Sequence, residues 1–229
     1  SPASAQIETT IWTPEEQGII QSMSELSEYP EPGGLKKLFA ISQKIAADFG
    51  ENSKLFAESL FQITLFHIYD GNWEAAKAPM DQSLARYRSA LEKADPYLAL
   101  YLHSAADVYL GEEQSYHPTA EAYLREALKI REKAYSEPKT SLNGNRLTLA
   151  ETLLMRTDVG FFDEAYRLLE KAKNDVLVFK LTEPQDVARW SVAAIAAALL
   201  TDESDTAISL LAEIFDPEHL VDKPIMLSN

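Results

Sequence analysis

A three-residue pattern recurs along this chain at nearly even spacing, and it constrains the fold more than any other feature. Each copy places residues at i, i+4 and i+7 on one helix face, and most copies begin with alanine. The copies begin at residues 35, 76, 120, 165 and 207, so the steps are 41, 44, 45 and 42. They comprise Leu35, Phe39, Ser42; Ala76, Met80, Ser83; Ala120, Leu124, Ala127; Ala165, Leu169, Ala172; and Ala207, Leu211, Ile214. Because small residues let a second helix approach closely, the pattern predicts repeated helix–helix contacts.

A second apolar segment with helical spacing precedes each triplet, and a short turn joins the two. In the second copy "LFAESLFQITLFHIYDGNW" ends in the turn Gly71-Asn72-Trp73, and in the fourth the turn is Gly160-Phe161-Phe162. A glycine after the first helix supplies a left-handed C-cap. No segment alternates with period two, as a strand would. The chain is therefore predicted to be all-α, with about five antiparallel helix pairs stacked into a right-handed superhelix, an α-α solenoid.

Prolines mark the boundaries of the predicted units. Thr13-Pro14 has the form of a helix N-cap with proline in the first turn, and Asp95-Pro96, Glu137-Pro138 and Glu183-Pro184 follow second helices. We expect a flexible N-terminal segment at 1–12, a repeat domain at 13–215 and a C-terminal tail at 216–229. The predicted units are 13–50, 51–94, 95–137, 138–183 and 184–215.

The turns and second helices resemble tetratricopeptide (TPR) repeats. "GNWEAAKAPMDQSL" and "GFFDEAYRLLEKA" resemble the TPR turn and second helix. "AEAYLREALKIREKAYSEP" is similar to the long-period variant, of about 42 residues, found in kinesin light chains and in many bacterial proteins. The resemblance covers roughly residues 14–215. It implies a binding scaffold without chemistry of its own, in which the first helices line a groove that holds a peptide or a partner helix.

Composition excludes several classes of partner and site. The chain has 229 residues and a formal net charge of −15, which disfavours nucleic acid and anionic lipid because both require a basic face. It has no cysteine, so disulfides and thiolate metal sites are excluded. The start "SPASAQ" has the small-x-small pattern that ends a secretory signal, which favours export (periplasmic or secreted) over the cytoplasm; the alternative is a flexible terminus of small residues.

The sequence carries no recognisable catalytic or metal motif. None of the four histidines lies at a metal-ligand spacing such as HExxH, and neither GxSxG nor a phosphate-binding loop occurs. Acid pairs such as Glu15-Glu16 fall at a helix start rather than in a predicted cleft. We therefore expect a protein that is not an enzyme and that has no cofactor or metal.

Helical phase predicts which residues face the groove. The candidates are Glu58, Phe61, Gln62, Leu65, Tyr69, His103, Ser104, Asp107, Glu151 and Leu154. The set is apolar, acidic or small, so we expect a peptide or protein partner with apolar anchors and basic neighbours, and we expect charge reversal at Glu58 and Glu151 to weaken its binding without unfolding the chain. The alternative is that the chain's own tail, residues 216–229, covers these side chains.

Two functions from different classes fit the sequence. The first is a non-enzymatic protein-interaction scaffold. The second is the recognition domain of a larger enzyme, such as a caspase-like protease or a signalling ATPase, whose catalytic part lies outside these residues. In either case the basic residues of 120–138, Arg125, Lys129, Arg131 and Lys133, are expected on a convex, solvated surface.

Overall fold

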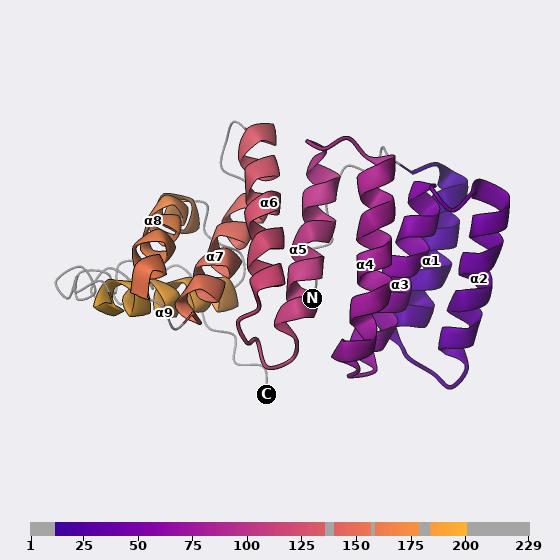
Figure 1. Ribbon diagram of the computed structural model, residues 1–229, viewed down its shortest axis with the longest axis horizontal. Coiled ribbons are helices and arrows are strands. Elements are labelled where there is room, and N and C mark those ends of the chain that lie inside the picture. Colours follow the sequence, from indigo (N-terminus) through magenta and orange to yellow (C-terminus); the bar gives the residue numbers. More distant parts are fainter. Residues whose placement is uncertain (1–11, 136–139, 157–158, 179–183, 201–229) are drawn as a thin grey trace. The chain divides into compact units, whose positions relative to one another are not determined.

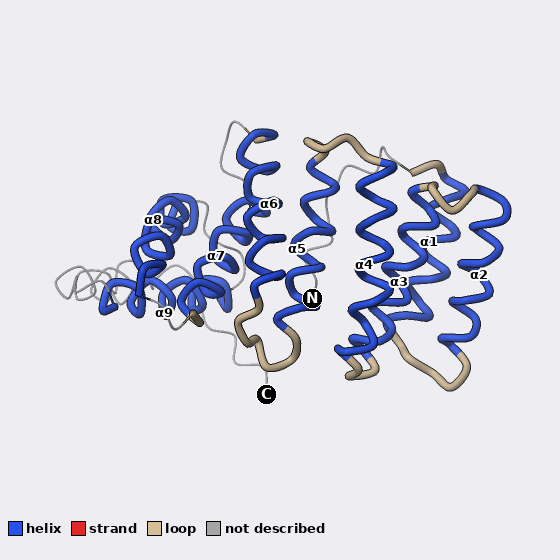
Figure 2. Tube along the Cα trace, viewed as in Figure 1, coloured by secondary structure: helices blue, strands red, loops and turns tan. Residues whose placement is uncertain are grey.

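The chain forms helices throughout the part that the structure describes. The computed structural model describes residues 12–135, 140–156, 159–178 and 184–200, and within these ranges every regular element is helical (Figure 2). The helices fall into two compact units, within Ser1–Ser136 and Glu137–Asn229. The first unit holds α1 to α6 and the second holds α7 to α9.

Six helices of similar length stand side by side in the first unit (Figure 1). They are α1 (Pro14–Glu28), α2 (Gly34–Phe49), α3 (Lys54–Tyr69), α4 (Trp73–Ala90), α5 (Pro96–Leu110) and α6 (Pro118–Ala134). The closest packing joins α3 to α4 and α5 to α6, the two helices of predicted units. In addition α3 packs against both α1 and α2, so each helix pair is stacked on the next.

Local sequence signals determine where these helices begin. Thr13 and Glu16 form a capping box at the start of α1, with the Thr13 hydroxyl accepting from the Glu16 N–H at 3.2 Å. Asn72 and Asp95 cap α4 and α5 through their side chains. Gly71 adopts a φ of 75° between α3 and α4, a conformation that glycine reaches without steric cost. The predicted turn Gly71-Asn72-Trp73 is therefore confirmed.

The triplets of the second, third and fourth units are confirmed as helix-contact positions. Ala76, Met80, Ser83, Ala120, Leu124, Ala127, Ala165 and Ala172 are each 0% exposed, and Leu169 is 1% exposed. The Ser83 hydroxyl donates to the Ala57 carbonyl at 2.8 Å, so even the polar member of the set joins α4 to α3. The fifth triplet lies outside the described residues.

The triplet predicted for the first unit is wrong at Phe39, whereas its third member, Ser42, is buried as predicted and its hydroxyl lies 2.8 Å from that of Ser59 in α3. Phe39 is 47% exposed, whereas Gly34 and Leu38, one position earlier, are buried. Gly34 is the small residue of this unit, and a Cβ built on it would stand 3.0 Å from Cε2 of Phe66 in α3. The prediction failed because the sequence offers two adjacent glycines before the helix and gives no sign of which one meets a neighbour.

The second unit packs three helices around leucine and alanine side chains and Trp190. It contains α7 (Thr140–Leu154), a 3-10 turn η2 (Val159–Phe161), α8 (Phe162–Val178) and α9 (Pro184–Leu200). Within it α8 packs against both α7 and α9. The Trp190 side chain is 1% exposed and its Nε1 donates to the Leu169 carbonyl at 3.1 Å. A backbone carbonyl of α8 thus satisfies the indole N–H that α9 buries.

Candidate binding face

The ten residues predicted for the groove lie on three helices with very different exposure. Five lie on α3 and three on α5, both in the first unit, and Glu151 and Leu154 lie on α7 in the second. Glu58 and Gln62 are buried, at 5% exposed each, while Tyr69 is 50% exposed. The other members are half-buried: Phe61, Leu65, His103, Ser104, Asp107, Glu151 and Leu154.

Glu58 does not offer its charge to a partner, contrary to the expectation from helical phase. Its carboxylate accepts hydrogen bonds from the Tyr87 hydroxyl at 2.5 Å, from the Tyr101 hydroxyl, and from Gln62 Nε2 at 2.7 Å. Within the described residues it forms no ion pair. Three donors from α3, α4 and α5 therefore take the place of solvent around this carboxylate.

Gln62 is likewise part of the core. Its Nε2 donates to Glu58, and its Oε1 accepts from the Ser27 hydroxyl at 2.6 Å. Because Ser27 lies in α1, these bonds extend the polar network across α1, α3, α4 and α5. A buried network of this kind is favourable only when each member has its partners, as these have.

The two tyrosines at Glu58 are held as neutral donors. Their rings stack with centroids 3.7 Å apart and planes 21° apart. Burial, together with the nearby Glu58 carboxylate, raises the pKa of Tyr87 and that of Tyr101 well above the usual value of 10.0. Both hydroxyls therefore keep their hydrogen at neutral pH and direct it toward Glu58.

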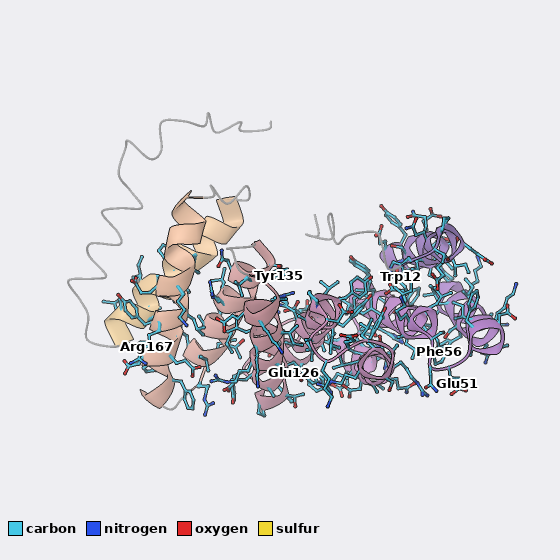
Figure 3. All side chains as sticks on the ribbon, turned by 90° about the horizontal axis from the view of Figure 1, so that it is seen from above. Trp12, Glu51, Phe56, Glu126, Tyr135 and Arg167 are labelled. Atoms are coloured by element: carbon cyan, nitrogen blue, oxygen red, sulfur yellow. The ribbon has the colours of Figure 1, made fainter. Side chains whose placement is uncertain are left out.

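Trp12 joins this network from the segment that precedes α1. Its Nε1 donates to the Tyr97 hydroxyl at 2.9 Å, and its ring meets the Tyr97 ring edge-on with centroids 6.2 Å apart. The Lys54 ammonium lies 5.5 Å from the centroid of the indole. Because Lys54 begins α3 and Tyr97 lies in the first turn of α5, Trp12 contacts the first turns of both helices. Figure 3 shows Trp12 on a different side of the unit from Phe56.

Partly exposed residues of α3 and α5, most of them apolar, flank the buried network. We call this surface the α3–α5 face and define it by Phe61, Leu65 and Tyr69 of α3 and by Leu100 and Ser104 of α5. Phe61, Leu65, Leu100 and Ser104 are half-buried and Tyr69 is exposed. The Phe61 ring contacts the Tyr101 ring edge-on at 5.0 Å, so the face rests directly on the polar network.

His103, Asp107 and Arg131 meet beside this face. An Arg131 Nη1 lies 3.3 Å from His103 Nδ1, and His103 Nε2 lies 3.9 Å from an Asp107 carboxylate oxygen. Arg131 is 5% exposed, and burial lowers its pKa to about 10.

The expected solvated position of Arg131 is therefore wrong, whereas Lys129 and Lys133 are exposed. The sequence pattern could not reveal that α5 covers this one arginine.

The α7 candidates belong to a separate unit. Glu151 and Leu154 are half-buried on α7, and their neighbours Leu147 and Ala150, which share the predicted phase, are buried at 5% and 0% exposed. Both Glu151 and Leu154 stay predictions as partner-binding residues.

Sequence reasoning missed the residues that organise the site, namely Trp12, Ser27, Tyr87, Tyr97 and Tyr101. One signal was present: Tyr97 and Tyr101 are four residues apart, so they share a helix face. Nothing in the sequence indicated that the same face would meet Glu58, which is 43 residues away from Tyr101.

Within the described residues, no three histidine, aspartate or glutamate side chains gather as metal ligands would. The same ranges contain no helix with the length and hydrophobicity needed to cross a membrane.

No protein-family model and no curated protein matches the sequence. Solved structures do resemble it. One is a crystal structure of a "Podosopora anserina putative kinesin light chain" with "nearly identical TPR-like repeats"; it shares 18% identity, the match covers 90% of this chain and 97% of that one, and the TM-score is 0.69. A Q17M form of it also shares 18% identity, with 89% and 95% covered and a TM-score of 0.67.

This likeness establishes the fold class. The chain has the all-α fold of a TPR-like helical-repeat solenoid, and the resemblance to the kinesin-light-chain variant that the sequence pattern indicated is confirmed.

Proposed function

We propose that the chain is a non-enzymatic protein-interaction scaffold that binds a peptide or a partner protein on the α3–α5 face. The observation that carries the proposal is the half-buried apolar surface of Phe61, Leu65 and Leu100, set on the rigid network of Glu58 and its tyrosines. Apolar surface that is accessible and pre-organised is the part of an interface that contributes most to affinity.

The chemistry of the partner follows from what the face exposes. The Glu58 carboxylate accepts hydrogen bonds from within the chain, so it is not accessible to a basic residue of the partner. It therefore gives the face no preference for a basic partner. Apolar anchors on the partner therefore carry the affinity, and a basic neighbour would meet only the more exposed carboxylate of Asp107, whose side chain is 48% exposed.

A displayed peptide library, selected for binding to the immobilised chain, tests the proposal. A selected peptide is measured by calorimetry against wild type, against Leu65→Lys, and against Phe39→Lys as a matched control. Phe39 is an exposed apolar residue of α2 that lies outside the α3–α5 face. We expect Leu65→Lys to weaken binding at least tenfold, about 1.4 kcal/mol, and Phe39→Lys to leave it unchanged. Equal effects of the two substitutions, with circular dichroism showing both folded, would contradict the assignment of the face.

A further inference from the structure

We propose that the contact site of Trp12 on α3 and α5 is a recognition site for an indole side chain. The chain fills this site with its own Trp12, and a tryptophan of the partner takes it by displacing Trp12. The inference rests on the proposed function, because it names the side chain that the partner presents next to the α3–α5 face.

The site recognises the indole through more than apolar contact. Tyr97 accepts the indole N–H at 2.9 Å and presents its ring edge-on, and the Lys54 ammonium lies 5.5 Å from the centroid of the indole. A cation near an indole ring is attracted to its electron-rich face more strongly than to that of phenylalanine. The three contacts are therefore complementary to the donor atom and to the π-system of a tryptophan.

The hydroxyl oxygen of Tyr97 is the acceptor that the site offers to an indole. The indole Nε1 only donates, a carboxylate only accepts, and each tyrosine hydroxyl has a single hydrogen. The Tyr101 hydroxyl is directed at the Glu58 carboxylate and, at the longer distance of 3.4 Å, at the Tyr97 oxygen. The shorter contact of the Tyr97 oxygen is the one from Trp12 Nε1, at 2.9 Å. The site is therefore complementary to an N–H donor.

The acceptor stays in place when Trp12 leaves. Tyr101 is buried and stacked on Tyr87, and the Tyr97 ring packs edge-on against both, with centroids 5.2 Å and 6.3 Å away. The Asp95 carboxylate also accepts from the Tyr97 N–H at 2.8 Å and fixes the first turn of α5. Little reorganisation is therefore needed for a second indole to bind.

Trp12 is held by side-chain contacts rather than by the helical hydrogen bonds of α1: its ring packs against the core formed by α1, α2 and α3, and its carbonyl accepts from Gln17 Nε2 at 3.4 Å. It precedes the N-cap Thr13 and lies outside α1, so it can leave without breaking a helical hydrogen bond. Both Trp12 and Tyr97 are half-buried, so the contact is accessible from solvent. A tryptophan of the partner competes with Trp12 for the site. The apparent affinity for the partner is therefore the intrinsic affinity multiplied by the fraction of molecules whose site is open.

The test uses N-acetyltryptophanamide as the probe and saturation-transfer NMR as the measurement. We expect the Trp12→Ala variant to bind the probe and the wild type to bind it several-fold more weakly. N-acetyl-1-methyltryptophanamide, which lacks only the indole N–H, should bind Trp12→Ala about two- to tenfold more weakly, the range of one neutral hydrogen bond. N-acetylphenylalaninamide, which also lacks the indole π-system, should bind more weakly than N-acetyltryptophanamide as well. Adding Tyr97→Phe to Trp12→Ala should abolish the preference for N-acetyltryptophanamide over its methylated form.

A second measurement does not depend on the stability of Trp12→Ala. The chain labelled with 5-fluorotryptophan has three fluorine signals, one for each of its three tryptophans. Tyr97→Phe should shift the Trp12 signal alone, and excess N-acetyltryptophanamide should move the wild-type Trp12 signal toward that of a solvated indole. A Trp12 signal that responds to neither change, or a folded Trp12→Ala chain that binds all three probes equally, would overturn the proposal.

The two proposals fail in different ways. Peptides that bind through Leu65 but show no preference for tryptophan would leave the scaffold function standing and remove the indole site. If Trp12→Ala bound N-acetyltryptophanamide but no peptide that binds the α3–α5 face could be selected, the indole site would be supported and the scaffold function would be contradicted.

Discussion

Gly34 lies against the edge of the Phe66 ring, so close that a Cβ built on the glycine would stand 3.0 Å from Cε2 of that ring. A larger side chain at this position must displace the Phe66 ring or push α2 away from α3. We expect Gly34→Leu to lower the free energy of unfolding by about 1–3 kcal/mol through overpacking. Urea denaturation followed by circular dichroism measures the change.

Gly18 provides the matched control. It lies within α1, it is exposed, and a Cβ built on it would meet nothing within 4 Å. We expect Gly18→Ala to raise the free energy of unfolding by about 0.5–1 kcal/mol, because alanine has the higher helix propensity. If both substitutions changed stability in the same direction, the close contact at Gly34 would not be what determines it.

The buried alanines of the repeats should resist enlargement. Ala120 and Ala165 are both 0% exposed, so Ala120→Leu or Ala165→Leu should each lower the free energy of unfolding by about 1–3 kcal/mol. Ala85, on the exposed side of α4, is the control. Ala85→Leu should stay within about 0.5 kcal/mol of wild type in the same denaturation experiment, and a loss as large as that of Ala120→Leu would contradict the helix register.

Charge reversal at Glu58 should unfold the chain rather than act on a partner. Glu58→Lys would leave a buried ammonium facing the hydroxyls of Tyr87 and Tyr101, and we expect it to cost about 3–5 kcal/mol. The exposed Glu112 serves as the control, and Glu112→Lys should leave the thermal midpoint nearly unchanged. A Glu58→Lys chain as stable as wild type would show that the carboxylate is not enclosed.

Alkaline pH should destabilise the first unit through its buried tyrosines. Burial and Glu58 raise the folded-state pKa of Tyr87 and of Tyr101 well above 10.0, so the unfolded chain releases these protons first. Their contribution to stability is complete below about pH 10 and is lost as the pH rises further. We expect the urea midpoint to fall between pH 9 and pH 11, and Tyr101→Phe to reduce that fall; an unchanged slope would contradict the burial of the hydroxyl.

The fold could be predicted because its signals are local. Gly71 and Asn72 determine a turn and an N-cap between neighbouring helices, and Ala76 and Ala120 recur at a spacing that one helix pair dictates. Such features depend on a few adjacent residues, and TPR-like packing repeats them. The error at Gly34 arose where the local pattern was ambiguous, since only the position of Phe66 decides which glycine of the pair is covered.

The candidate site could be predicted only in part, for a related physical reason. Helical phase placed Glu58, Phe61 and Leu65 on one side of α3, yet phase describes a single helix. Whether Glu58 is solvated depends on Tyr87 and Tyr101, which arrive from two other helices. Polar pairing over 29 and 43 residues leaves no periodic trace in the sequence.

The Trp12–Tyr97 hydrogen bond has a consequence for cooperativity. In a repeat array most contacts join neighbours, so a terminal helix can fray while the rest stays folded. Here residues 85 positions apart are tied together, and complete release of the first helix must break a bond to the fifth. Amide protons of α1 should therefore exchange more slowly than those of an untethered end, and a partner that displaces Trp12 would loosen the first repeat as it binds.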